Sequence, residues 1–267
     1  MRTNLGSTPT FLILLASGLA VRIALIFHSG HAADIHLFEG WAAKGATLGV
    51  TRMYDVSQGT EAVDYPPLLL YVYALIGRIV FAIQHDFHHS EVFMAVLKSP
   101  AIVTDCVIMA CLFWRGSRVV PGADTPLAAG LFFLLPPSWL DSAVWGQVDA
   151  VYAGLIFVAF VAVASRRPLI AGVAAGLAVT TKFQVVALLP MLAVIAIAID
   201  WKTFIRSFGA FAATVVVVCL PFILAGRFDS LVGAYGRAVG AYAILSVDAF
   251  NIWFLLFGRA ARQVSDG

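Results

Sequence analysis

The sequence has few charged residues for its length. Only 12% of its 267 residues are Asp, Glu, Lys or Arg, whereas 61% are hydrophobic and the mean hydropathy is +0.92. A soluble globular domain carries about 25% charged residues, so this chain lacks about half of the usual water-facing side chains. The composition excludes an ordinary soluble domain and predicts a protein embedded in a bilayer.

Motifs that bind nucleotides or nucleic acids are also missing. There is no Gly-x-Gly-x-x-Gly after a strand, no Walker-type loop and no soluble segment that could cradle a nucleotide. The net charge is +2 and no basic cluster indicates a nucleic-acid partner. The three cysteines, Cys106, Cys111 and Cys219, lie inside apolar runs, which is typical of small core residues rather than of disulfides or a metal site.

Most of the sequence consists of apolar runs long enough to cross about 30 Å of hydrocarbon. They cover residues 9–28, 66–83, 92–114, 126–140, 148–164, 169–199 and 208–225, with a shorter run at 252–257. The 169–199 run is too long for one helix, so we expect two helices divided around Lys182 to Pro190. The sequence thus predicts an all-α polytopic transmembrane bundle of about eight helices, forming a single membrane-embedded module over residues 1–267.

Basic residues in short loops predict which side of the membrane each loop faces. Arg115 and Arg118, Arg166 and Arg167, and Lys202 and Arg206 mark cytoplasmic loops. The first exoplasmic loop is then 29–64, but a second outer segment at 86–91 conflicts with a simple span at 66–83. Either that span is partly re-entrant or one basic loop misleads. A cleaved signal peptide is the alternative for the N-terminus, and Arg22 inside its apolar run counts against it.

The long first loop contains its own helical pattern. Leu37, Phe38, Trp41 and Leu48 recur at helical spacing. This pattern predicts a short helix lying in the membrane interface, with Trp41 at headgroup level. The alternative is an ordinary amphipathic connector.

Several charged residues stand in or beside apolar runs, where lipid exposure is costly. Asp105 follows Lys98 by two helical turns, so the two side chains share a face and could converge on a polar cavity. The alternatives are a snorkelling Lys98 and an Asp105 that pairs within the bundle. Asp149 could be a helix cap. Lys182 could bind a phosphate or pair with an acid of the bundle.

Several motifs resemble those of GT-C glycosyltransferases. Ala33-Asp34 followed by Trp41 resembles the first outer loop of the enzymes that build N-glycan precursors, including the dolichyl-phosphate-glucose glucosyltransferases, and the segment from Asp64-Tyr65 to Leu68 is similar to their Asp-Tyr-Pro-Pro element. The segments 145–149 and 181–184 resemble prokaryotic mannosyltransferase-like members, and Asn251 belongs to an Asn-x-Trp element. The eukaryotic enzymes have a His-rich segment where this chain has 145–149, so their sugar specificity does not carry over.

The resemblance implies a mechanism. Asp34 would be the general base that takes the proton of an acceptor hydroxyl, and the attack would invert the anomeric carbon. Lys182, or in second place Lys98, would stabilise the leaving phosphate. Asp34 as an interfacial residue without a role is the alternative. The candidate residues that contact donor or acceptor are Trp41, Asp64, Tyr65, Lys98, Asp105, Gln147, Asp149, Lys182, Gln184 and Asn251.

The expected substrates follow from the same resemblance. The donor would be a polyprenyl-phosphate hexose, with mannose favoured over glucose, and the acceptor a glycan, a lipid or a protein at the outer face of the cell membrane. No cofactor is expected, and a divalent metal requirement stays open. Members of the clan continue for several more helices, so we expect a short member or a truncated chain. A transporter or lipid flippase, or a non-catalytic membrane subunit, is the alternative function.

Overall fold

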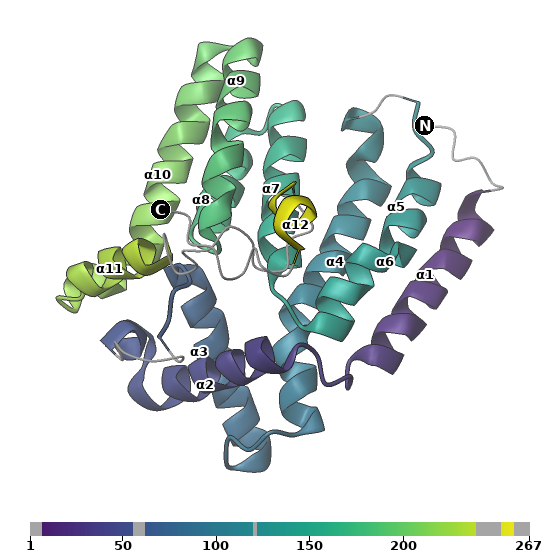
Figure 1. The fold of residues 1–267 in the computed structure, drawn as a ribbon. Coiled ribbons are helices and arrows are strands. Elements are labelled where there is room, and N and C mark those ends of the chain that lie inside the picture. The colour runs from purple at the N-terminus through teal and green to yellow at the C-terminus, as the bar shows by residue number, and fades with distance from the viewer. Residues whose placement is uncertain (1–6, 56–61, 120–121, 239–251, 259–267) are drawn as a thin grey trace.

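The protein is entirely helical in the part of the chain that the computed structural model describes, residues 7–55, 62–119, 122–238 and 252–258 (Figure 1). In chain order the elements are α1 (Ser7–Leu25), α2 (Ala32–Leu48), η1 (Val50–Asp55), α3 (Pro67–Gln84), α4 (Glu91–Val119), α5 (Thr125–Leu134), α6 (Pro136–Trp139), η2 (Leu140–Trp145), α7 (Asp149–Ala164), α8 (Pro168–Val179), η3 (Phe183–Leu188), α9 (Leu189–Ile199), α10 (Trp201–Leu224), α11 (Phe228–Ala238) and α12 (Ile252–Phe257). The predicted all-α fold is confirmed.

The apolar segments occur where the sequence predicts them, but few have the length of a full span. Among the described residues, Pro67–Gln84, Glu91–Trp114 and Trp201–Leu224 are long and apolar enough to cross a bilayer. Thr125–Leu134 and Pro136–Trp145, bent by 50°, make a fourth if they are counted as one span. Pro9–Leu25, Asp149–Ala164, Pro168–Val179 and Phe183–Ile199 are shorter apolar helices. This arrangement is compatible with a helical membrane bundle.

The predicted break in the 169–199 run is confirmed, because α8 ends at Val179 and α9 begins at Leu189. The hydroxyls of Thr180 and Thr181 donate to the carbonyls of Gly176 and Leu177, at 2.9 and 2.7 Å, and satisfy the end of α8. Lys182 then adopts an extended conformation and η3 follows. The break therefore places Lys182 at an end of the bundle rather than in its middle.

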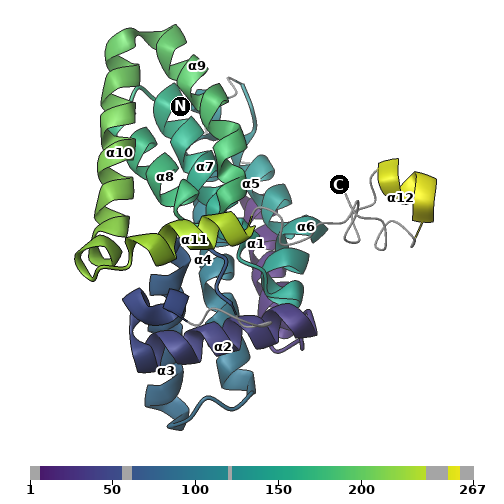
Figure 2. The same cartoon turned by 60° about the vertical axis from the view of Figure 1, so that its left-hand side comes forward.

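Figures 1 and 2 show α7, α8, α9 and α10 standing side by side. Arg166 and Arg167 lie between α7 and α8, at the opposite end of α7 from Asp149. At 1.5 Å per residue, the 16 residues of α7 separate the two ends by about 24 Å. At the start of α10, Asp200 caps the helix, and bonds from the Thr203 amide and hydroxyl hold the pKa of Asp200 below its usual value.

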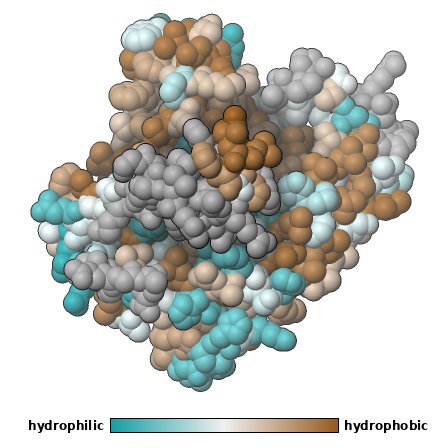
Figure 3. Space-filling view, viewed as in Figure 1, coloured by the Kyte–Doolittle hydropathy of each residue, from teal (hydrophilic) through white to brown (hydrophobic). Residues whose placement is uncertain are grey.

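The hydropathy of the outer surface also differs between parts of the molecule. Hydrophobic residues cover much of the face over the long helices, whereas hydrophilic residues gather where α2 and the turn between α3 and α4 lie (Figure 3). Val194, Val217 and Leu224 are large apolar side chains on the exposed faces of α9 and α10. Apolar side chains exposed along the long helices, with polar residues at one end, suit a protein that lies in a bilayer.

The segment α2 lies across one end of the bundle and packs closely on α3 (Figure 1). Glycines make this approach feasible, since a Cβ on Gly77 would lie 2.0 Å from the Ala42 carbonyl oxygen, and one on Gly45 would lie 2.7 Å from Ala74 Cα. The helix predicted in the 29–64 loop is therefore present, held by backbone contact with α3.

The predicted place of Trp41 at headgroup level is wrong. Its side chain is fully buried, with ring centroids 5.5 Å from Phe38, 5.1 Å from Tyr65 and 5.5 Å from Tyr73. The reason is that α3 covers the apolar face of α2, which helical spacing alone could not reveal. Trp41 is a core residue of this aromatic cluster and presents no surface to a substrate in this structure.

The course of α3 bears on the conflict between loops 29–64 and 86–91. The amide of Leu68, at the start of α3, donates to the carbonyl of Thr180 at 2.8 Å. From there α3 runs past α2 to the turn before α4, which lies at the same end of the molecule as α2 (Figure 1). Despite its length, α3 does not join opposite ends of the bundle, so its two flanking segments can share one side.

Candidate active site

Asp34 lies in the first turn of α2, and neighbouring side chains hold its carboxylate. Trp145 Nε1 and Gln147 Nε2 each donate to Asp34 Oδ2 at 2.8 Å, and His31 Nδ1 lies 3.2 Å from the same oxygen. The side chain remains 26% exposed, and no described residue donates to Oδ1. Asp34 is thus an oriented but reachable carboxylate, which is the geometry that a general base needs.

The partners of Asp34 come from the turn that follows η2. This single turn of π-helix ends at Trp145, and Gly146 then reverses the chain with a φ of 84°, a left-handed conformation that glycine tolerates best. His31 donates its backbone N–H to the Trp145 carbonyl at 3.2 Å, and the two rings stack with centroids 5.2 Å apart. The turn therefore fixes Trp145 and Gln147 against the start of α2.

A second charged group lies at the same end of the bundle. The ammonium of Lys182 forms an ion pair with Asp149 Oδ1, at the start of α7. Its Nζ lies 5.4 Å from the ring centroid of Tyr65 and 5.6 Å from that of Tyr152. The lysine side chain is 13% exposed and the aspartate 40%. Lys182 pairs with an acid of the bundle, as one sequence alternative held, but the pair is open to the surface.

Tyr73 of α3 connects the two groups. The carboxylates of Asp34, Asp64 and Asp149 all interact electrostatically with its buried hydroxyl. The ring of Tyr65, which faces Lys182, belongs to the same aromatic cluster. The structure therefore brings together six predicted site residues at one end of the bundle: Asp34, Asp64, Tyr65, Gln147, Asp149 and Lys182.

Lys98, the second candidate for the donor phosphate, does not reach this surface. Its side chain is fully buried, and Nζ donates to the carbonyls of His28, Ala143 and Val144 at 2.6, 2.8 and 3.3 Å. The prediction of a donor contact fails because backbone oxygens already occupy the ammonium.

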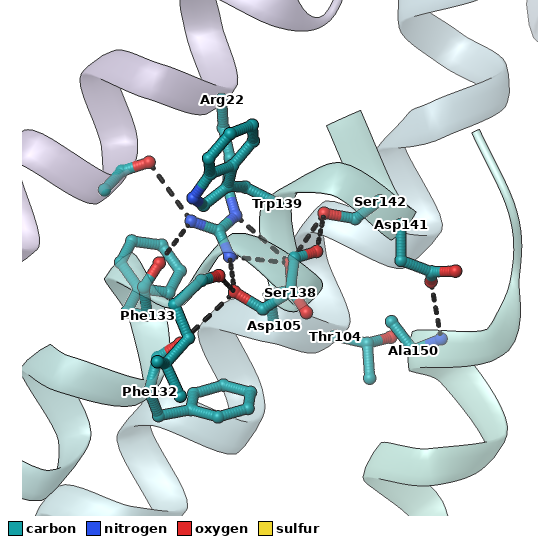
Figure 4. A network of polar contacts seen from close by, with 12 residues as sticks. Arg22, Thr104, Asp105, Phe132, Phe133, Ser138, Trp139, Asp141, Ser142 and Ala150 are labelled. Carbon is teal, nitrogen blue, oxygen red and sulfur yellow. Dashed lines mark hydrogen bonds and ion pairs between the residues drawn. The ribbon is translucent and has the colours of Figure 1, made fainter. Parts of the chain in front are cut away.

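Asp105 is also buried, and it pairs with Arg22 of α1 (Figure 4). Arg22 Nε and Nη2 donate to Asp105 Oδ2 at 3.1 and 2.8 Å, and Ser142 Oγ donates to the same oxygen at 2.7 Å. The predicted polar cavity shared by Lys98 and Asp105 is therefore wrong. Both residues lie on one face of α4, as their spacing predicted, but each is satisfied within the protein.

Sequence reasoning missed several residues of this region. Arg22 was the clearest signal, since a charge inside an apolar run needs a partner. His31 precedes one recognised motif and Trp145 belongs to another, but neither was assigned a role. Asp141 accepts a hydrogen bond from the Ala150 amide at 3.3 Å and interacts electrostatically with Asp149 and Lys182.

Two predicted residues remain, Gln184 and Asn251. Gln184 is exposed on η3, and Asn251 lies outside the described residues. No group of three or more His, Cys, Asp or Glu side chains arranged for a metal ion occurs among the residues that the structure describes.

Comparison with known proteins assigns the chain to a class. A family model that matches residues 64–264 identifies it as a GT-C-type glycosyltransferase. The model describes glycosyltransferase family 87, and the chain belongs to this family. The matched range includes Asp64, Gln147, Asp149 and Lys182 and begins after Asp34. The protein is an enzyme of glycosyltransferase type, which favours that function over a transporter or a non-catalytic subunit. No curated protein matches the chain significantly.

Proposed function

We propose that the protein transfers a hexose, mannose in preference to glucose, from a polyprenyl-phosphate donor to a hydroxyl of a glycan, lipid or protein. The acceptor oxygen bonds to the anomeric carbon as the bond from that carbon to the phosphate oxygen breaks. Asp34 takes the hydroxyl proton, and polyprenyl phosphate leaves. A single displacement of this kind inverts the anomeric centre.

The observation that carries this proposal is the environment of Asp34. Trp145 and Gln147 both donate to Oδ2 and fix the carboxylate, while the side chain stays partly exposed.

The charge of the leaving phosphate would be stabilised by Lys182. Its ammonium is partly exposed at the same end of the bundle and is paired with a single carboxylate, Asp149, among the described residues. One turn further along the chain, Val186 begins the lining of an apolar groove of about 360 Å³ between α8, α9 and α10, which continues to Phe211. Because Val186 follows Lys182 by four residues, a phosphate held by Lys182 would place its hydrocarbon tail near the start of this groove.

We propose a multi-pass protein of the cell membrane with this site on the exoplasmic face. The support is the distribution of charge along the bundle. Arg166, Arg167 and Lys202 lie at the opposite end from Asp149 and Lys182, and basic loops favour the cytoplasm.

The test uses purified protein in lipid vesicles with a membrane extract as the acceptor. Labelled polyprenyl-phosphate mannose, polyprenyl-phosphate glucose and the corresponding nucleotide sugars are supplied separately. Transfer is expected from a lipid-linked sugar, with mannose faster than glucose. Transfer from a nucleotide sugar alone, without polyprenyl phosphate or an enzyme that charges it, would contradict the proposal.

A further inference from the structure

Lys98 occupies an unusual place for a cation. It lies on α4, its side chain is fully buried, and no described carboxylate lies within ion-pair distance of it. All three hydrogens of an ammonium group have an acceptor here, the backbone oxygens of His28, Ala143 and Val144. A buried charge is costly unless it is hydrogen-bonded in this way, so the contacts demand an explanation.

The three carbonyls belong to the two segments that hold Asp34. His28 follows the end of α1 and precedes His31, which contacts Asp34. Ala143 and Val144 lie in the last turn of η2, directly before Trp145. Carbonyls at the end of a helical turn lack partners within the helix and carry partial negative charge. Lys98 therefore binds the ends of two elements that meet at the site.

Packing around Lys98 joins these segments further. Gly146 lies so close that a Cβ there would be 3.2 Å from Lys98 Cε and 2.7 Å from Ile35 Cδ1 of α2. On the other side, Gly30 takes a φ of 70°, and a Cβ there would be 2.7 Å from the Trp145 carbonyl oxygen. The side chain of Lys98 thus fills the space directly behind the turn that carries Trp145 and Gln147.

The residue of η2 just before Ala143 has a separate anchor. Ser142 donates to Asp105 at 2.7 Å, and Asp105 is held by Arg22 (Figure 4). Both Lys98 and Asp105 come from one face of α4, so a single helix holds η2 at successive residues. Asp105 ties η2 to α1, whereas Lys98 ties it to the residues beside Asp34.

We propose that Lys98 is a positioning residue for transfer, because it clamps the His28–His31 and Ala143–Gln147 segments and so keeps Trp145 and Gln147 on Asp34. This inference rests on the proposed role of Asp34 as the base. Lys98 touches neither donor nor acceptor, and it acts through the orientation of the carboxylate. It is thereby distinct from Lys182, whose proposed contact is with the donor.

The experiment compares Lys98→Met, Lys98→Arg and Ser99→Ala in vesicles. Ser99 is the matched control, since its hydroxyl donates to the Val96 carbonyl at 2.7 Å within the same helix and lies outside the site. Hydrogen–deuterium exchange is followed in peptides covering residues 26–36 and 140–149, with 168–179 as the reference. Steady-state transfer is measured across pH, together with the melting temperature.

Lys98→Met should speed exchange in both site peptides and leave the reference peptide unchanged. Its kcat should fall about 100-fold, as a displacement of about 1 Å in a catalytic group can cause. At each pH the KM for the donor should stay within twofold of the wild-type value, because Lys98 touches neither donor nor acceptor. Lys98→Arg should restore part of the kcat, and Ser99→Ala should resemble the wild type.

Unchanged exchange in the two site peptides would overturn the clamp. Faster exchange with a kcat within twofold of the wild type would overturn the positioning role, because Lys98 would then make only a structural contact. The exchange measurement does not need activity. If the wild type transfers no sugar, the proposed function fails, while the exchange data still decide whether Lys98 holds the two segments.

Discussion

The ion pairs Arg22–Asp105 and Lys182–Asp149 each join distant parts of this bundle, and they differ in how completely their donors are used. The guanidinium of Arg22 makes five hydrogen bonds, to Asp105, Gly18, Phe133 and Ser138, and both charged side chains are 2% exposed or less. The ammonium of Lys182 has one hydrogen-bonding partner among the described residues, Asp149, and that aspartate is 40% exposed.

The difference separates charge used for assembly from charge left for ligands. A guanidinium has five N–H donors, so Arg22 has none to spare, and it ties α1 to α4 and to the segment around α6. Among the described residues, Lys182 donates to Asp149 alone, and its ammonium lies near two tyrosine rings. Charged residues in apolar segments are thus of two kinds here, and mutation should distinguish them.

The largest effect, on turnover, is expected for Asp34→Asn, which keeps the size of the side chain but removes the base. Turnover should fall by about 10²–10⁴-fold, the usual contribution of general-base catalysis. The melting temperature should stay near that of the wild type because the side chain is partly exposed. Radiolabelled transfer and thermal unfolding are measured on the same preparation.

Asp86→Asn is the matched control for this variant. Asp86 is an exposed carboxylate in the turn between α3 and α4, where its side chain contacts His88. It should transfer sugar at the wild-type rate. If Asp34→Asn retained more than about a third of the wild-type activity, Asp34 would not be the base, and Asp64 and Asp149 would become the candidates.

The buried Arg22–Asp105 pair should instead affect the stability of the fold. Arg22→Met leaves Asp105 buried without its partner, and breaking such a pair costs about 3–5 kcal/mol. Thermal unfolding in detergent should show a large fall in stability. The double variant Arg22→Met with Asp105→Leu should recover most of it, because apolar residues replace a buried pair at little cost.

Arg52→Met is the control for the buried arginine, since Arg52 is a largely exposed partner of Asp55 at 3.6 Å. Its effect on stability should be below about 1 kcal/mol. Equal melting temperatures for Arg22→Met and Arg52→Met would show that the buried network does not hold the bundle.

Much of this fold was predictable because apolar periodicity is local. The break near Lys182, the helix containing Asp34 and the shared face of Lys98 and Asp105 follow from spacing along the chain. Their partners do not. Arg22 lies 83 residues from Asp105, and such pairing depends on how helices pack.

The same limit explains the two main errors. Spacing placed Phe38 and Trp41 on one face of α2, but only the position of α3 shows that protein rather than lipid covers that face. Lys98 resembled a ligand-binding cation because its acceptors are backbone carbonyls, which leave no signature in a sequence.

A smaller effect, on donor use, is expected for Lys182 of the Lys182–Asp149 pair. Lys182→Met keeps much of the apolar stem and removes the ammonium, so donor use should weaken at least tenfold, or about 1.4 kcal/mol. Lys182→Arg should recover part of it, since the charge returns with another geometry. Donor dependence and melting temperature are measured together. A lower melting temperature with unchanged donor dependence would make Lys182 a structural partner of Asp149.

The smallest effect is expected from Asp149→Asn, and it tests the comparison most directly. The substitution removes the partner of Lys182 just as Arg22→Met removes the partner of Asp105. Here, however, the remaining charge is close to the surface and keeps access to water. Asp149 also lies in the first turn of α7, where an acid favours the helix by about 0.3–1 kcal/mol, and a solvent-exposed pair adds about as much. Stability should therefore fall by about 1 kcal/mol, well below the loss for Arg22→Met.

Thermal unfolding of Asp149→Asn and Arg22→Met in the same detergent gives the ratio of the two stability losses. Equal losses would mean that the Lys182 pair is as much a part of the framework as the buried one, and its proposed contact with the donor phosphate would then lose its basis.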